Sequence, residues 1–307
     1  MRPVLGLDQG LDRDQGLIDL RGAAGASRRL SRWLHTKRRT RLVALIGAPS
    51  AWLLLMYIGS LIALFLNSAY RLNEDGSGID KTLSTDNLHE IVTTTVYRDV
   101  AVRTILIAVA VTVIDALLAL PLAFFMAKLA KPRWRSLLVA AVLVPLWASY
   151  LVKAFSWRSL LAAPGGVLER TFGHSPGYGI GGLIIVLSYL WLPYMVVPVY
   201  AGLERLPDSL LEASGDLGAR FGFTFRKVVL PIIVPSLVAG SVFTFSLTLG
   251  DYIAVSLVGG NTQMIGSIVY SNHASNLPLA AAYALVPVLV MVFYLFGIRR
   301  SGALEQL

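Results

Sequence analysis

Two acidic residues interrupt otherwise uncharged apolar segments of this 307-residue chain, and their positions suit chemistry with a cation. Asp115 is the twelfth residue of a 24-residue apolar segment, and Asp251 follows Gly250 near the end of another. A charged side chain at the centre of a membrane costs at least about 2.5 kcal/mol unless it faces water, a partner or a passing cation. Carboxylates with aromatic rings nearby, here Tyr252 and Trp147, suit an organic ammonium ion through charge pairing and cation–π contact. We predict that Asp115, Asp251, Tyr252 and Trp147 line a path for a cation.

Each acid also has a structural interpretation that the sequence leaves open. Asp115 could hold a polar contact with another helix or pair with a basic residue of a partner subunit. Asp251 lies nearer the end of its segment, where its carboxylate could bind backbone amides at a helix break. Substitution by asparagine, which keeps the shape and removes the charge, separates these roles from a transport path.

Motifs for enzymatic chemistry are incomplete. Residues 173–177 match the G-x-S-x-G nucleophile motif, but they lie between two apolar segments rather than on a strand-to-helix turn. Glycines 177, 179 and 182 match a dinucleotide-binding pattern without the strand or the acidic residue that it needs. The four histidines lie far apart, the chain has no cysteine, and no lysine follows a glycine as a P-loop requires. We therefore expect no catalytic group, metal or cofactor on this chain, and we expect any ATP and Mg²⁺ to bind to another subunit.

The composition excludes an ordinary soluble domain. Hydrophobic residues make up 55% of the chain and charged residues 15%, with a mean hydropathy of +0.66, whereas soluble domains average about 25% charged residues. The formal charge of +9 does not indicate nucleic acid, because the basic residues gather beside the apolar segments. Lipid is therefore the solvent for much of this chain.

Six apolar segments can cross a membrane as helices, at about 1.5 Å per residue against an apolar core of about 30 Å. They cover residues 42–66, 104–127, 137–152, 179–203, 232–258 and 279–298. Prolines lie within several of them, where neighbouring helices can satisfy the carbonyls that a kink frees. We predict an all-α integral membrane protein whose six transmembrane helices fill residues 42–300, between a basic tail at 1–41 and a short tail at 301–307.

The basic residues orient these helices. Of the 27 lysines and arginines, 20 lie in the two tails and in the loops on the same side, and 7 lie on the opposite side. Cytoplasmic loops carry such an excess, so both termini should lie in the cytoplasm. Leu30, Trp33 and Leu34 give the end of the first tail an apolar side, which favours contact with anionic lipid over a regulatory role.

The loop at 204–231 differs from the other loops on its side because its acidic and basic residues balance. Pro207 and Asp208 form a helix start signal, and Gly218 suits a left-handed cap at the helix end. Asp208, Glu212 and Asp216 recur at four-residue spacing and form an acidic stripe, which repels itself without a basic partner. A short exposed helix of this kind should dock on another protein. Its apolar face consists of Leu210, Leu211 and Leu217. Two small residues, Ala213 and Ser214, permit the close approach of a partner.

The same loop resembles a known motif. It is similar to the EAA loop, E-A-A-x3-G-x9-I-x-L-P, of permease subunits in binding-protein-dependent ABC importers, through Glu212-Ala213-Ser214, Gly218 and Val228-Val229-Leu230-Pro231. Ser214 and Val228 are conservative departures from that pattern. In the family this loop sits in a cleft of the ATPase subunit. The resemblance therefore implies ATPase coupling by Asp208, Glu212, Ala213, Ser214, Asp216, Gly218, Leu230 and Pro231.

Two further stretches resemble the spermidine/putrescine branch of this family. One covers residues 145–157, with its proline, two tryptophans and lysine, and is followed by two glycines at 165–166. The other holds Gly-Asp-Tyr at 250–252, two glycines at 259–260 and Met-Ile-Gly at 264–266. The solute that these stretches imply is a polyamine, spermidine or putrescine.

The resemblance, which covers about residues 42–300, implies a MetI-like permease with six transmembrane helices in a bacterial inner membrane. It implies an ATPase dimer that binds ATP and Mg²⁺, a second and distinct permease, an external solute-binding protein and membrane lipid as partners, with no nucleic acid. ATP binding would close the ATPase dimer, and the EAA loop would transmit that movement as a switch between inward-facing and outward-facing states.

Three alternatives stay open on the sequence. Permeases for ferric ion, phosphonates and other small solutes share much of the pattern. An ion-driven transporter or channel would explain Asp115 and Asp251 but not the EAA loop. A membrane enzyme or sensor would use the loop at 173–177, but it lacks a complete catalytic set.

Overall fold

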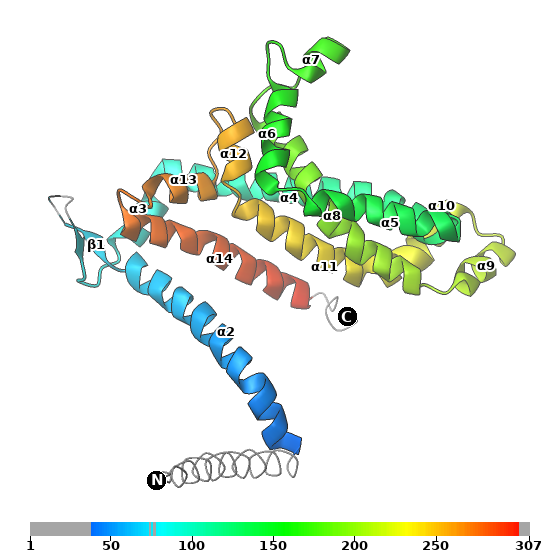
Figure 1. The fold of residues 1–307 in the computed structure, drawn as a ribbon, viewed down its shortest axis with the longest axis horizontal. Helices are drawn as coiled ribbons and strands as arrows, with labels where there is room; N and C mark the ends of the chain where they lie inside the picture. Colours follow the sequence, from blue (N-terminus) through cyan, green and yellow to red (C-terminus); the bar gives the residue numbers. More distant parts are fainter. Residues whose placement is uncertain (1–37, 74, 76–77, 301–307) are drawn as a thin grey trace, which may run out of the picture. The chain divides into compact units, whose positions relative to one another are not determined.

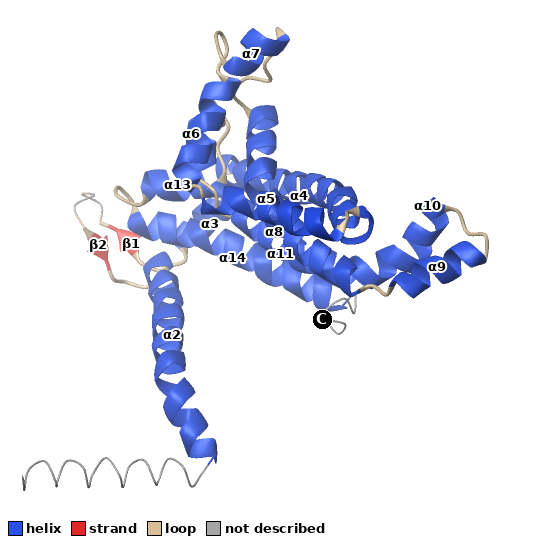
Figure 2. Ribbon diagram, turned by 45° about the vertical axis from the view of Figure 1, so that its right-hand side comes forward, coloured by secondary structure: helices blue, strands red, loops and turns tan. Residues whose placement is uncertain are grey.

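The computed structural model describes residues 38–73, 75 and 78–300, and these residues are mostly helical (Figures 1 and 2). The chain divides after Ala63 into two units, which are described separately. The first unit contributes most of helix α2 (Arg38–Ser68), whose apolar side chains, such as Leu55 and Tyr57, are exposed. The prediction for the tail at 1–41 falls almost wholly outside the described residues, as does the one for 301–307.

The second unit begins with the last turn of α2, which is followed by a short antiparallel pair of strands in which Arg71 lies opposite Asp80. It contains all the remaining elements, and together they bear out the predicted all-α class. In chain order they are β1 (Arg71–Leu72), β2 (Ile79–Asp80), α3 (Asp86–Thr93), α4 (Thr95–Phe124), the π-helical segment η1 (Phe125–Leu129), α5 (Pro132–Trp147), α6 (Tyr150–Leu161), α7 (Val167–Phe172), α8 (Ile180–Arg205), α9 (Asp208–Asp216), α10 (Phe221–Thr224), the π-helical segment η2 (Phe225–Val229), α11 (Leu230–Leu249), α12 (Ile253–Val258), α13 (Ile265–Asn272) and α14 (Leu277–Arg300).

Helices α4, α8 and α11 pack together as the core of this unit (Figure 1). The buried side chains between them are largely aliphatic: Val111 on α4 and Leu187 on α8 belong to one cluster, and Val199 on α8 and Ile233 on α11 belong to another. Gly240 allows α11 to approach α8 closely, because a Cβ there would lie 2.6 Å from the sulfur of Met195. Close approach at a small residue is typical of helix contacts in membranes.

Five helical segments of the described residues are long and apolar enough to cross a membrane, and the bent pair α5–α6 makes a sixth if it counts as one crossing. The five cover residues 49–68, 95–129, 180–205, 221–249 and 277–300. With the bent pair counted as one crossing, the total agrees with the six transmembrane helices that the sequence predicts. Figures 1 and 2 show α6 and α7 leading away from the helices of the core, while α9 and α10 lie at a different end.

The third predicted span, 137–152, is not one helix. Helix α5 ends at Trp147, α6 begins at Tyr150, and the two are bent by 92°. Ala148 and Ser149 join them with ψ angles of 139° and 134°, which are extended rather than helical. The helical hydrogen bonds cannot continue through this backbone, whereas average hydropathy runs across it without a signal.

The fifth predicted span, 232–258, is also divided. Helix α11 ends at Leu249 and α12 begins at Ile253, so residues 250–252 form a break. Asp251 therefore lies in a helix break, as its structural interpretation supposed, and not within one continuous helix over 232–258. This break positions the carboxylate that the next section describes.

Candidate coupling and translocation sites

Helix α9 has the ends that the sequence predicts. It follows Pro207, begins at Asp208 and closes at Gly218, whose φ of +77° is left-handed. The N–H of Ala219 donates to the carbonyl of Ser214 (3.1 Å), and the N–H of Gly218 donates to that of Gly215 (2.8 Å). These two bonds form a Schellman cap, which satisfies carbonyls at the helix end and favours glycine at the left-handed position.

The acidic stripe of α9 has a basic partner within the chain. Asp208, Glu212 and Asp216 are all exposed. Lys128, at the end of the α4 span, donates from Nζ to Asp208 Oδ1 (2.7 Å) and to the carbonyl of Leu206 (2.6 Å). The hydrogen bond from Lys128, followed by its charge, lowers the pKa of Asp208 below its ordinary value. Lys128 therefore joins α4 to the start of α9, while the other two acids stay open to solvent.

One predicted feature of α9 differs in the structure. Ser214 is buried, and its Oγ lies 2.7 Å from the Oγ1 of Thr224 on α10, so it holds the loop together and does not face a partner. Ala213 is exposed, and Leu217 is 88% exposed. Leu211 packs into the core instead of sharing an exposed face with Leu217. A groove of about 600 Å³ runs beneath these residues and is lined by Leu210, Ala213, Ser214, Leu217, Gly218, Ala219, Arg220, Phe223 and Val228.

The rest of the loop packs back onto α4. Phe124 makes edge-to-face contacts with Phe221 (ring centroids 5.6 Å apart) and with Phe225 (6.0 Å). Leu230 and Pro231 begin α11, which continues directly from α10 and η2, and the wider π-helical turn before Pro231 accommodates a residue that cannot donate an N–H. These two motif residues belong to the start of a membrane helix and not to α9. The end of α4 therefore contacts the loop twice, at Lys128 and at Phe124.

Asp251 lies in the break between α11 and α12, where it is 7% exposed. Tyr150 donates its O–H to Asp251 Oδ2 (2.5 Å), and the N–H of Ala254 donates to Oδ1 (2.9 Å). The amide contact is the one that the structural interpretation of Asp251 predicts. It fixes the carboxylate at the start of α12.

A pocket of about 330 Å³ adjoins Asp251. Its aromatic lining comes from Tyr150, Trp191 and Tyr252, and Tyr150 stacks on Trp191 with ring centroids 5.8 Å apart. Asp251 and its sequence neighbour Tyr252 both line this pocket. The structure adds Tyr150 and Trp191, which the sequence reasoning did not select.

The other two predicted path residues lie elsewhere. Trp147 is 89% exposed at the bend between α5 and α6, and it does not line the Asp251 pocket. Asp115 is fully buried on α4, and neither carboxylate oxygen has a hydrogen-bond partner among the described residues. Ser188 on α8 is its polar neighbour. An acid buried in this way does not face a partner subunit.

The helical fold, the exposed helix α9 and the buried acids of the apolar core define a membrane transport subunit. The chain belongs to the family described as the binding-protein-dependent transport system inner membrane component, whose model matches residues 22–301. This places it among the multi-pass permeases of the bacterial inner membrane and confirms the predicted family and MetI-like fold.

Two relatives and one solved structure show how close the similarity is. The inner membrane ABC transporter permease protein YdcU of Escherichia coli (strain K12) is 40% identical over 286 residues, which are 87% of this chain and 91% of that protein. The spermidine/putrescine transport system permease protein PotB of the same strain is 26% identical over 276 residues, 86% of this chain and 97% of that protein. The bacterial alginate ABC transporter, solved in complex with alginate pentasaccharide-bound periplasmic protein, shares the fold, with a TM-score of 0.69 and 16% identity over 87% of this chain and 97% of that one. These relatives are permease subunits and not enzymes, as the sequence predicts.

Proposed function

We propose that this chain forms the membrane path for a polyamine, spermidine or putrescine, and that a separate ATPase drives it through α9. The observation that carries the proposal is the pocket at Asp251, where a buried carboxylate lies beside the rings of Tyr150, Trp191 and Tyr252. A carboxylate supplies charge pairing to an ammonium group, and aromatic faces supply cation–π contact. The printed name of the PotB relative supports the same substrate class.

The hydrogen bonds of Asp251 already engage both of its carboxylate oxygens. Tyr150 and the Ala254 amide each donate to one carboxylate oxygen, so an arriving ammonium group competes with the tyrosine O–H for the charge of Asp251. The burial of Asp251 also disfavours anionic solutes, because like charges repel strongly where water is excluded. Among the alternatives, a phosphonate is therefore the poorest fit. Asp115 joins this proposal as a second carboxylate, which the helices around it would uncover when the permease changes state.

The exposed side of α9 supports docking on an ATPase subunit. Glu212 and Asp216 are free for a basic cleft, and Leu217 offers an apolar contact beside the groove. ATP and Mg²⁺ would bind to an ATPase dimer and not to this chain. The remaining partners in the proposal are a second, distinct permease, an external solute-binding protein and the surrounding lipid.

Uptake of labelled spermidine tests the proposed substrate. The cells lack other polyamine importers and produce this chain with its partner subunits. We expect Asp251→Asn to reduce uptake at least about tenfold, since a charged contact is lost, while Asp80→Asn, which changes an exposed acid on β2, leaves it unchanged. Unlabelled putrescine should compete, and a phosphonate or ferric ion should not. Normal uptake in Asp251→Asn, or competition by a phosphonate, would contradict the proposal.

A further inference from the structure

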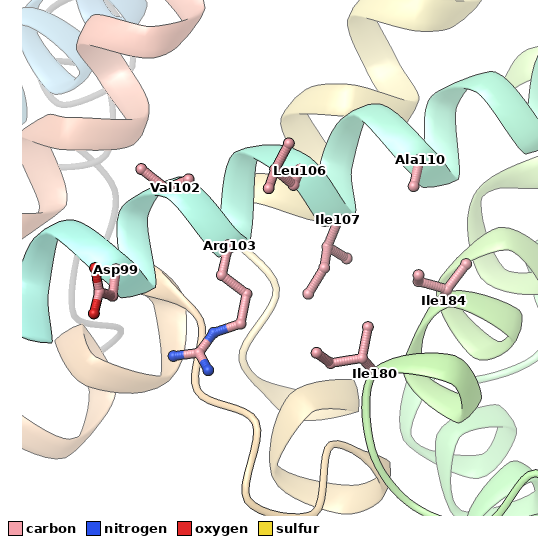
Figure 3. A pocket seen from close by; sticks show the side chains of 8 residues that line it. All are labelled: Asp99, Val102, Arg103, Leu106, Ile107, Ala110, Ile180 and Ile184. Atoms are coloured by element: carbon pink, nitrogen blue, oxygen red, sulfur yellow. The ribbon is translucent and has the colours of Figure 1, made fainter.

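A groove lined by residues of α4 and α8 forms a candidate binding site apart from the Asp251 pocket and from α9. This groove of about 600 Å³ runs between α4 and the first turns of α8 (Figure 3). Figure 3 shows Ile107 on α4 facing Ile180 and Ile184 on α8, with Arg103 extending from α4 beside them. The lining residues are Asp99, Val102, Arg103, Leu106, Ile107, Ala110, Ile180 and Ile184.

The two charged residues of this groove are not paired with each other. Asp99 and Arg103 lie one turn apart on α4, but no described ion pair includes either of them. The Nε of Arg103 is buried and has no hydrogen-bond partner among the described residues. A buried guanidinium N–H without an acceptor is an unsatisfied hydrogen-bond donor. The oxygens of a phosphate group are good acceptors for an arginine side chain.

The position of the groove along α4 corresponds to the headgroup region of a membrane. From Arg103 to Lys128 the helical segment rises about 37 Å, at about 1.5 Å per residue. A bilayer measures about 40 Å when its polar headgroup regions are included. These two cations therefore lie at opposite headgroup levels, and the aliphatic residues from Leu106 to Ala110 lie below Arg103 at the depth of acyl chains.

We propose that this groove binds one phospholipid with a zwitterionic ethanolamine headgroup. Its phosphate lies on Arg103, its ammonium group lies on Asp99, and one acyl chain follows the aliphatic wall formed by Leu106, Ile107 and Ile184. The lipid belongs to the leaflet at the amino-terminal end of α4, which is the outer leaflet in the orientation that the basic loops predict. Phosphatidylglycerol would also place its phosphate on Arg103, but its uncharged glycerol headgroup would leave Asp99 without a cationic partner. The site does not depend on which solute the permease carries.

Retention of phosphatidylethanolamine by the purified full-length chain tests this site. The chain is exchanged into detergent micelles that contain equal amounts of phosphatidylethanolamine and phosphatidylglycerol, and native mass spectrometry counts the bound molecules. We expect one phosphatidylethanolamine to remain on the wild type. Arg103→Gln should weaken retention at least about tenfold, because a charge-assisted contact is lost, and Ala110→Phe should weaken it by filling the groove.

Matched variants make the result specific. Arg98→Gln changes another arginine of α4 that does not line the groove, and it should retain the lipid. Arg103→Lys keeps a positive charge and should restore part of the binding that Arg103→Gln loses. Asp99→Asn should shift the preference toward phosphatidylglycerol. Equal retention in wild type, Arg103→Gln and Ala110→Phe would overturn the proposal, as would equal binding of the two lipids by the wild type.

Discussion

Replacing Lys128 by methionine should loosen the contact between α4 and α9. In the structure Lys128 ends the α4 span and holds both Asp208 and the carbonyl of Leu206. Methionine has a similar length and keeps the apolar packing of the stem, but it removes both donors. The variant thus isolates the polar join between a membrane helix and the exposed helix that we propose for ATPase docking.

The size of the effect follows from the burial of the two acceptors. The side chain of Lys128 is 8% exposed, whereas that of Asp208 is 74% exposed. In the variant, water therefore hydrates the exposed carboxylate of Asp208 in place of Lys128. Solvent also screens the ion pair in the wild type, so the loss of that pair contributes little to the change in stability. The carbonyl of Leu206 is partly buried, and a hydrogen bond from a charged donor contributes about 1.5–3 kcal/mol. We expect Lys128→Met to lower the free energy of unfolding by about this amount.

Thermal unfolding of the purified chain in detergent measures this loss. Lys131→Met is the control, because Lys131 is an exposed lysine three residues further along, just before α5. We expect a clear drop in Tm for Lys128→Met, a smaller drop for Asp208→Asn and no change for Lys131→Met. Equal Tm values for the two methionine variants, or a larger drop in Asp208→Asn, would refute the reasoning.

Three further predictions concern α9 and the Asp251 pocket. Glu212→Ala should leave membrane insertion intact but reduce retention of the ATPase on co-purification, and Gly218→Val should do the same, because a branched residue at a φ of +77° is strained by about 1–2 kcal/mol. Normal ATPase retention and normal transport in both variants would contradict the docking role. Lys128 lowers the pKa of Asp208 in the folded chain, so the ionised Asp208 stabilises the fold at pH values above its unfolded pKa of about 3.9. This contribution disappears as the pH falls through the lower pKa of the folded chain. The difference in Tm between wild type and Asp208→Asn should therefore vanish in acid, and a difference that persists below that range would count against the ion pair. Tyr150→Phe should lower the KM for spermidine, because the tyrosine O–H no longer competes with the ammonium group for Asp251; a raised or unchanged KM would argue against that competition.

Local signals in the sequence were enough to predict α9. Proline followed by an acid marks its start, and the glycine at position 218 marks its end, because each acts on backbone angles within a few residues. The contacts that fix α9 in place were not predictable in this way. Lys128 and Asp208 are 80 residues apart in sequence, and the sequence contains no local pattern that pairs them.

The breaks in the third and fifth predicted spans show a second limit of sequence reasoning. Hydropathy averages over a window, so two extended residues at 148–149 or a short break at 250–252 leave the average almost unchanged. Those breaks nevertheless determine the candidate path. They bring Tyr150, at the start of α6, to Asp251, 101 residues later in the chain, and they leave Trp147 exposed on the other side of the bend.

Site-directed crosslinking from α9 tests the central claim, that this helix docks on a separate ATPase. The chain has no cysteine, so single variants carry a thiol-linked photo-crosslinker at one known place. Leu217→Cys places it on the exposed end of α9, and Phe172→Cys places it on α7 as an equally accessible control. In the assembled complex we predict an ATPase adduct from position 217 and none from position 172. The absence of an adduct at 217, or equal adducts from both positions, would contradict the account.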